Sequence, residues 1–163
     1  MKIKCVIDNK NILLDVNSNK PLNLILKDGG QNIPNCDQKS CGNCVVLLND
    51  EAILACLIPA FRLKGAKILT FEGYQKSRFW HDLERAYADT GSQPCPHCFA
   101  SKTLIFESLL QLITRATKEE EVDEQTIVKE ISLNACPCLD AQEVIAIYNA
   151  AAVYRRRRRV RRS

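Results

Sequence analysis

Polar and apolar residues alternate along the first part of the chain, as they do in a strand that buries one face. The segment Lys2 to Ile7 alternates in this way, and after the polar residues 9–11 an apolar segment follows at Ile12 to Val16. The inward positions of the first segment are Ile3, Cys5 and Ile7. Two such segments separated by a short polar turn predict a β-hairpin.

A short helix and three further strands are predicted before residue 73. Pro21 lies near the first turn of an apolar helical segment that Gly29-Gly30 ends, and Asn17 or Ser18 can cap it. The predicted later strands are Val45 to Leu48, Ala52 to Leu57 and Lys67 to Glu72, with a turn at 49–51. Together these elements form a small mixed sheet that packs around one helix.

After Gly73 the apolar positions follow the helical period of 3.6. The predicted helices are Phe79 to Asp89, Ser101 to Ala116, Asp123 to Asn134 and Leu139 to Tyr154. Thr117 to Glu120 fits a capping box before the third of them. We therefore expect a domain boundary near Tyr74, with residues 75–78 as a short linker.

Nine cysteines are unusual in a chain of 163 residues. Neither a signal peptide nor an apolar stretch long enough to span a bilayer is evident, because uncharged stretches such as Ala52 to Phe61 are too short. We therefore expect a cytoplasmic protein without a membrane span. In that compartment cysteines serve more often as metal ligands than as disulfides.

The net charge of +4 comes from one end of the chain. The last nine residues, RRRRRVRRS, hold seven arginines, and removing these from the 23 Lys and Arg leaves 16 basic against 19 acidic side chains. The remainder is slightly acidic, which argues against a folded nucleic-acid-binding surface. Residues 155–163 are expected to form a mobile extension of the last helix outside the core.

Four cysteines share one stretch with the spacing C-x4-C-x2-C-x11-C: Cys36, Cys41, Cys44 and Cys56. A 2Fe-2S cluster needs four soft anionic ligands, and this spacing is that of plant-type ferredoxins. Zinc is the alternative, but zinc sites usually use two separated cysteine pairs. The stretch therefore predicts an iron-sulfur loop.

A second group, Cys95, Cys98, Cys136 and Cys138, lies between the predicted helices. In an antiparallel bundle the two loops that carry these cysteines emerge at one end, and their thiolates would suit either zinc or a second 2Fe-2S cluster. His97 does not make a Rieske centre, because the chain holds only two histidines and no Cys-x2-His partner motif; a solvated loop position is expected for it. Cys5 is expected to be a buried thiol and not a ligand.

Together the two cysteine groups resemble the iron-sulfur subunit of the xanthine dehydrogenase family of molybdenum hydroxylases, which oxidise aldehydes, carbon monoxide or nicotinate. The resemblance covers the chain up to about Tyr154 and rests on these segments: Asn35 to Leu48, Ala55 to Leu57, Ile68 to Gly73, Cys95 to Cys98 and Asn134 to Cys138. All eight cysteines of the two groups occur in the family's order.

The resemblance implies an α+β protein with two domains and a tail. Residues 1–74 would form a plant-type ferredoxin β-grasp domain, residues 75–154 a four-helix bundle domain, and 155–163 the Arg-rich tail. Each domain would hold one 2Fe-2S cluster on four of the eight cysteines. Molybdopterin and FAD are expected on partner chains, namely a molybdopterin-binding large subunit and an FAD subunit.

The chain departs from the family's pattern beside the second cysteine group. The family usually has a glutamine directly before the third cysteine pair, where it contacts the molybdopterin cofactor, whereas Pro94 stands there in this chain and Gln93 precedes it. Other departures are Lys39, Ser40, Phe99 to Ser101 and Leu139-Asp140. Gln93 is accordingly the candidate cofactor contact, in a rearranged form.

The leading functional prediction is an electron-transfer subunit without a catalytic site of its own, because no dinucleotide loop or nucleophile elbow is present. Two clusters in series would carry single electrons from a substrate-oxidising partner to a flavin or another acceptor. A second prediction is a structural metal-binding adaptor with one 2Fe-2S cluster and one zinc site. A third makes the arginine tail primary, as a binder of nucleic acid or an anionic surface.

Overall fold

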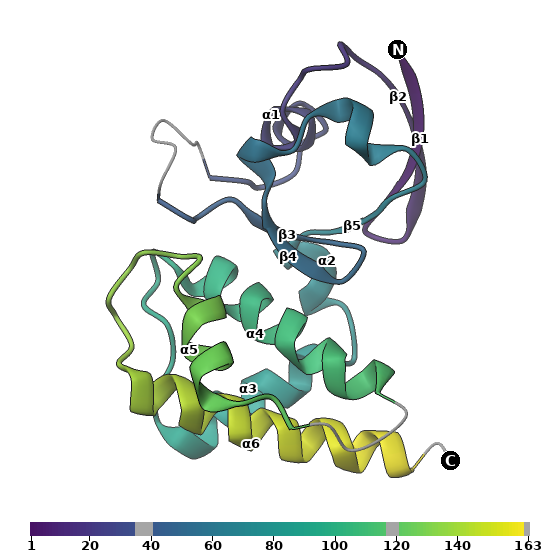
Figure 1. Cartoon of the computed structure of the whole chain (residues 1–163). Helices are drawn as coiled ribbons and strands as arrows, with labels where there is room; N and C mark the ends of the chain where they lie inside the picture. Colours follow the sequence, from purple (N-terminus) through teal and green to yellow (C-terminus); the bar gives the residue numbers. More distant parts are fainter. Residues whose placement is uncertain (35–40, 117–120, 162–163) are drawn as a thin grey trace.

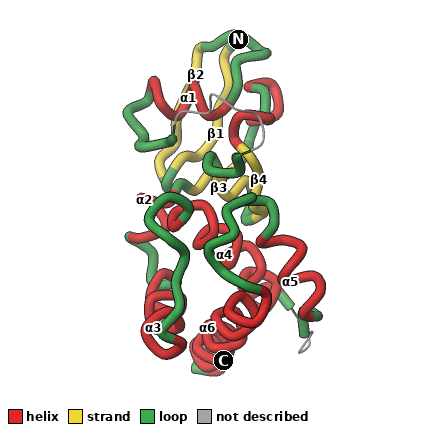
Figure 2. The backbone as a smooth tube through the Cα atoms, turned by 90° about the vertical axis from the view of Figure 1, so that its left-hand side faces the viewer, coloured by secondary structure: helices red, strands yellow, loops and turns green. Residues whose placement is uncertain are grey.

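One mixed sheet of five strands forms the first part of the molecule, and helices form the rest (Figures 1 and 2). The computed structural model describes residues 1–34, 41–116 and 121–161. The strands are β1 (Lys2–Ile7), β2 (Lys10–Asp15), β3 (Val45–Leu48), β4 (Glu51–Leu54) and β5 (Lys67–Leu69). Their order is β2-β1-β5-β3-β4, and only β1 and β5 run parallel.

Both hairpins close through two-residue turns. Asp8 and Asn9 have φ values of 47° and 65°, and Asn49 and Asp50 have 51° and 69°. Two successive positive φ values are typical of type I′ turns, which match the twist of a hairpin and accept Asn and Asp. The predicted three-residue turns at 9–11 and 49–51 were therefore too long, and β2 and β4 begin earlier than expected.

Two predicted strands end sooner than the alternation indicated. After β4 the chain enters the 3-10 turns η1 (Ala55–Leu57) and η2 (Ala60–Leu63), so that Cys56 lies in a turn and not in a strand. After β5 it enters the short helix α2 (Phe71–Gln75). The side chain of Thr70 caps α2 by accepting a hydrogen bond from the Gly73 N–H at 3.3 Å. Because Thr70 caps α2, residues 71–72 belong to that helix and not to the predicted strand.

Helix α1 (Leu22–Asp28) packs on one face of the sheet (Figure 1). It begins after Pro21, which takes the N-cap position without a side-chain hydrogen bond, and its C-cap is Gly29. The predicted cap at Asn17 or Ser18 was therefore wrong, whereas the glycine end is confirmed.

The four longer helices follow the predicted period. They are α3 (Trp80–Thr90), α4 (Phe99–Arg115), α5 (Glu124–Ile131) and α6 (Ala141–Val160). The predicted capping box at 117–120 lies outside the described residues, and Asp123 caps α5 by accepting a hydrogen bond from Thr126 N–H. None of the helices in the described part of the chain combines the length and the apolar character needed to cross a bilayer.

Strand β3 belongs to both hydrophobic cores of the molecule. Val46 packs with α1 and the inner face of β1, whereas Val45 and Leu47 pack with the helices. Successive side chains of a strand point to opposite faces, so one short strand joins the two cores. Helix α4 lies directly beneath this strand in Figure 1 and contacts it.

The arginine run does not lie wholly outside the core, which corrects the expectation for residues 155–163. Helix α6 continues to Val160, and the Arg155 side chain is only 2% exposed. Its Nε donates to Asp82 at 2.7 Å, and its Nη2 donates to Glu107 at 2.7 Å. Burial alone would lower the pKa of Arg155, but the two carboxylates outweigh it and raise the pKa. Arg155, although it belongs to the arginine run, is therefore a buried residue of the helical core.

Candidate metal centre

Four thiols converge at one end of the helices. Their sulfur atoms all lie within 4.8 Å of one another, and they belong to Cys95, Cys98, Cys136 and Cys138. Cys95 Sγ lies 3.6 Å from the sulfurs of both Cys98 and Cys136, and Cys98 Sγ lies 3.2 Å from that of Cys138. The structure therefore brings together the whole second cysteine group, as the antiparallel arrangement predicted.

The loop that carries Cys95 and Cys98 is held in a defined conformation at both of its ends. Helix α3 ends at Gly91, whose φ of 68° is the left-handed conformation that glycine accepts without strain. Cys98 occupies the N-cap position of α4, and its N–H donates to the Cys95 carbonyl at 3.1 Å. Phe99 anchors the start of α4 through edge contacts with Phe71 and Trp80. The two thiols of this loop are thereby fixed on one tight turn.

The second pair lies just before α6. Asp140 caps this helix through a full capping box, in which its side chain accepts from Glu143 N–H and Glu143 accepts from Asp140 N–H. Glu143 also accepts a hydrogen bond from Ser92 Oγ at 3.1 Å, which ties this loop to the loop of the first pair. The capping box therefore positions the loop as well as the helix.

The thiols differ in acidity. The pKa of Cys95 is lowered to about 7, first by the Cys98 N–H, which stabilises the thiolate by a hydrogen bond. Burial raises the pKa of Cys98 and of Cys136. Cys95 therefore reaches the thiolate form that metals require before Cys98 and Cys136 do.

The donor set fits a soft metal centre. Four thiolates hold either zinc or an iron-sulfur cluster. Zinc–sulfur bonds of about 2.3 Å in a tetrahedron put neighbouring sulfurs at about 3.8 Å, near the 3.2 to 3.6 Å found here. A 2Fe-2S cluster uses the same four ligands but requires the two pairs to move apart.

The first cysteine group is described in part, because Cys36 lies outside the described residues together with Lys39 and Ser40. Cys44 is 2% exposed, and its carbonyl accepts the Ala55 N–H at 3.0 Å. That bond brings the 3-10 turn with Cys56 alongside the cysteine loop. Cys41 is half-buried next to Gly42.

A network of hydrogen bonds joins the two cysteine loops. The buried Asn134 amide donates to the Gly42 carbonyl at 3.0 Å and to Asn43 Oδ1 at 2.7 Å. Its oxygen accepts the N–H of Cys136 at 3.0 Å. One side chain, two residues before a cysteine of the second group, therefore holds the loop of the first group in place.

Gly42 makes the close approach possible. Its φ is 74°, and a Cβ at this position would lie 2.3 Å from the Leu133 carbonyl oxygen and 2.5 Å from Asn134 Cα. His97 also belongs to this junction, because the Asn43 amide donates to His97 Nε2 at 2.8 Å. The expected exposed loop position of His97 is confirmed, and the hydrogen bond to Asn43 adds a contact that was not predicted.

Sequence reasoning included Gly42 and Asn134 in the matched segments but missed their structural role. The available signal was their position, since each lies one or two residues from a cysteine in its loop. Gln93 is exposed beside the buried Pro94. Its contact with a cofactor stays a prediction.

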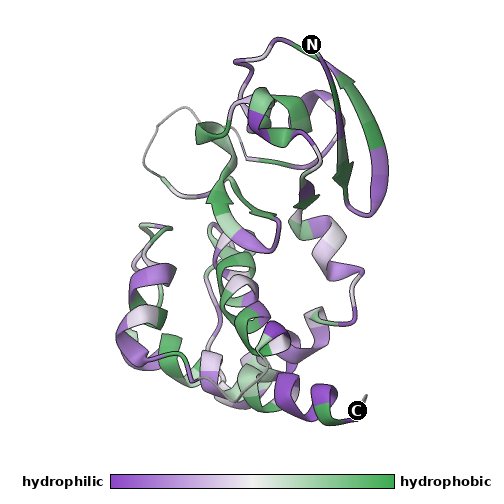
Figure 3. Ribbon diagram, turned by 45° about the vertical axis from the view of Figure 1, so that its right-hand side comes forward, coloured by the Kyte–Doolittle hydropathy of each residue, from purple (hydrophilic) through white to green (hydrophobic). Residues whose placement is uncertain are grey.

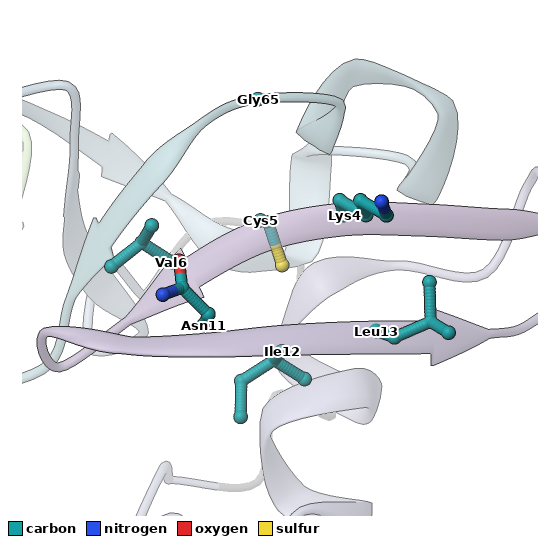
Figure 4. Close-up of a pocket in the computed structure, with 7 residues that line it drawn as sticks. All are labelled: Lys4, Cys5, Val6, Asn11, Ile12, Leu13 and Gly65. Carbon is teal, nitrogen blue, oxygen red and sulfur yellow. The ribbon is translucent and has the colours of Figure 1, made fainter.

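Cys5 lies apart from the four-thiol site, in β1 opposite Ile12 of β2 (Figure 4). It is 4% exposed, and burial raises the pKa of its thiol. The shallow cavity beside it, about 450 Å³, includes exposed parts of both strands and Gly65. This is the environment of a small apolar side chain, as predicted for Cys5.

The chain is similar in sequence to iron-sulfur subunits of several dehydrogenases. It is 30% identical over 122 residues to one of the subunits of nicotinate dehydrogenase from Pseudomonas putida, covering 75% of this chain and 74% of that protein. It is 28% identical over 145 residues to the xanthine dehydrogenase iron-sulfur-binding subunit of Escherichia coli O157:H7, covering 88% and 89%. No family model matches the chain.

The fold is also found among solved structures. Quinoline 2-oxidoreductase from Pseudomonas putida 86 superposes with a TM-score of 0.74 at 24% identity, over 96% of both chains. Aldehyde oxidoreductase from Desulfovibrio gigas superposes with the same score over 96% of this chain and 17% of that one. The arrangement of sheet and helices is therefore the fold of the quinoline 2-oxidoreductase chain and of one part of the aldehyde oxidoreductase chain.

Proposed function

This chain belongs to the family of iron-sulfur subunits of xanthine dehydrogenases and aldehyde oxidoreductases, and from that premise we propose that it relays single electrons through two 2Fe-2S clusters. The electrons would pass from a substrate-oxidising, molybdopterin-binding large subunit to a flavin or another acceptor. The observation that carries the proposal is the convergence of four thiols from two loops about forty residues apart.

The proposed ligands of the first cluster are Cys36, Cys41, Cys44 and Cys56, and those of the second are Cys95, Cys98, Cys136 and Cys138. A 2Fe-2S cluster supplies one-electron transfer when bound. The chain's own contribution is to hold and shield these ligands. Cys44 and Cys98 are almost fully buried, which keeps water from part of each site.

We further propose that residues 1–74 form a ferredoxin-type β-grasp domain and residues 75–154 a helical cluster-binding domain. Tyr74 marks the junction, since it is fully buried and its hydroxyl donates to Glu107 at 2.7 Å. Relatives are named as subunits, which supports partner chains that carry molybdopterin and FAD. The exposed Gln93 would contact the molybdopterin, and the complex would be cytoplasmic.

Metal analysis and purification test the proposal together. The chain, purified anaerobically by an affinity tag, should carry about four irons and no zinc, show two paramagnetic signals after reduction, and retain a large subunit that contains molybdenum. Gln93→Ala should slow electron transfer between the subunits without changing the iron content. A preparation with no iron would refute the electron-transfer function, and an unchanged rate in Gln93→Ala would refute that contact alone.

One observation favours a second candidate function. Three of the sulfur–sulfur distances are 3.2 to 3.6 Å and all four sulfurs lie within 4.8 Å of one another, which is close to what a single tetrahedral ion requires. The chain would then be a structural adaptor with one 2Fe-2S cluster and one zinc ion. About two irons and one zinc per chain, with a single paramagnetic signal, would establish this function in place of the first.

A further inference from the structure

Four arginines surround a cavity of about 380 Å³ between α3 and the end of α6. It lies at the opposite end of α6 from the four-thiol site, where Figure 3 shows the helix as strongly hydrophilic. Its lining residues are Asp82, Arg85, Tyr154, Arg157, Arg158 and Arg161. A volume in this range suits a small molecule, since ligand pockets measure roughly 300 to 1,000 Å³.

The one carboxylate in the lining is already engaged. Asp82 Oδ1 accepts from Arg158 Nη2 at 2.7 Å, and Asp82 Oδ2 accepts from Arg155 Nε at 2.7 Å. Its side chain is 2% exposed, and Arg155 lies behind the cavity in the core. Asp82 therefore fixes Arg158 in place and has no charge left to balance the other arginines.

Arg85 reaches the cavity from a different helix. Its guanidinium lies 5.6 Å from the centre of the Tyr154 ring, a cation–π distance, and the Tyr154 hydroxyl donates to Asp89. Tyr154 is thereby held against α3, with the Arg85 guanidinium over its ring, and both side chains line the cavity together with the arginines of α6. Among the described residues, no carboxylate forms an ion pair with Arg85, Arg157 or Arg161.

The helix dipole does not account for this arrangement. Cations in the last turn of a helix are stabilised by its partial negative charge, and this explains part of the arginine run on α6. Arg85, however, is the sixth residue of α3, where the dipole offers a cation nothing. Guanidinium groups that converge from two helices repel one another unless an anion lies between them.

We propose that this cavity binds a small polyanion with two linked phosphoryl groups, either free pyrophosphate or the diphosphate of a nucleotide. The planar fork of a guanidinium donates two parallel hydrogen bonds to a phosphate, and two prearranged arginines can each take one phosphoryl group. Arg158 and Arg85 are the prearranged pair, and Arg157 and Arg161 complete the charge. The proposal does not depend on the metal content of the cysteine sites.

Calorimetric titration of the purified full chain with pyrophosphate tests the site, with ionic strength held constant by chloride. Arg85→Gln and Arg161→Gln should each weaken binding about tenfold or more, because each removes a charge-assisted hydrogen bond. Arg62→Gln is the matched control, since it removes the same charge from an exposed position in the η2 turn. Its affinity should stay within about twofold of the unmodified protein, because exposed charges beyond a screening length act weakly.

Further ligands separate the two sources of the diphosphate. ADP that binds more tightly than pyrophosphate, with adenosine inactive, would identify a nucleotide site, and equal affinities would identify the diphosphate alone. No measurable pyrophosphate binding would overturn the proposal. Equal weakening by Arg62→Gln would also overturn it, as would a DNA duplex that binds more tightly than pyrophosphate and depends on Arg85.

Discussion

The two cysteine groups are assembled in opposite ways. The first takes three of its four cysteines from one stretch of nine residues, and the fourth follows on the next turn of chain after a hairpin. The second takes two pairs from loops about forty residues apart, which meet only because α3, α4, α5 and α6 pack together. The proposed first site would therefore depend on a local loop, whereas the second depends on the whole helical core.

This difference determines what each group can stabilise. A metal that joins two distant loops closes a long stretch of chain and restrains the helices on both sides of it. A metal held within one loop restrains little beyond that loop. The hydrogen bond from Asn134 to the Gly42 carbonyl nevertheless joins the two cysteine loops directly.

The largest contrast is expected from loss of one ligand in each group. Cys98→Ser should remove about half of the bound iron and lower the thermal midpoint of the helical part strongly, since metal binding there is coupled to folding. Cys56→Ser should remove a similar share of iron with a much smaller effect on the helices. Iron analysis, paramagnetic resonance and helical circular dichroism on heating measure the three effects.

Cys5→Ser is the control for both variants. It changes a buried thiol that lies outside the four-thiol site, so both paramagnetic signals should remain. Equal loss of helical stability in Cys98→Ser and Cys56→Ser would contradict the distinction between a local and a long-range site.

The difference between a local and a long-range site also explains which features could be predicted from the sequence. The spacing of Cys36 to Cys56 predicts an iron-sulfur loop, which stays a prediction, and the helical period placed the four long helices to within about three residues except at the end of α6. The second group could be predicted only from the order and direction of the helices. The assumed antiparallel arrangement correctly placed its four cysteines together. Strand ends were predicted less well, because a two-residue turn at Asp8 and the cap at Thr70 outweigh simple alternation.

Buried charges were the main feature that sequence reasoning missed. Arg155 appeared to be one of seven similar arginines, and nothing in the run itself distinguishes it. Its partners are Asp82 and Glu107, each flanked by a buried apolar residue on its helix. Only the packing of α3, α4 and α6 shows that one arginine of the run faces two carboxylates.

Arg155→Met should therefore destabilise the helical part by about 3 to 5 kcal/mol, because it leaves the buried Glu107 without its cationic partner and removes one of the two from Asp82. The sheet and the first cysteine group should be affected far less. Chemical denaturation followed by circular dichroism measures the free energy of unfolding. Arg157→Met is the matched control, because that side chain is exposed and should change the free energy by less than about 0.5 kcal/mol. Similar losses of unfolding free energy in the two variants would show that Arg155 is not part of the folded core.

Gly42→Ala should disturb both cysteine groups, because Gly42 lies where their two loops meet. The left-handed backbone costs an alanine about 1 to 2 kcal/mol, and its Cβ would also collide with the backbone of Leu133 and Asn134. Gly65→Ala shares the positive φ of 71° but meets nothing within 4 Å, so it isolates the conformational cost. Gly42→Ala should lower stability clearly more than Gly65→Ala and broaden both paramagnetic signals. Equal effects would mean that the two loops are not in close contact.

Asn134 offers the finest test of that junction, because its two ends serve different cysteine loops. Asn134→Ala removes the donor to Gly42 and the acceptor for the Cys136 N–H, and we expect a loss of about 1 to 3 kcal/mol for leaving these buried groups unpaired. Asn134→Asp keeps an acceptor for Cys136 but places a carboxylate beside the Gly42 carbonyl and Asn43 Oδ1. It should therefore preserve the signal of the second cluster while shifting that of the first. If Asn134→Asp instead disturbs only the second signal, the side chain orders its own loop and does not link the two sites.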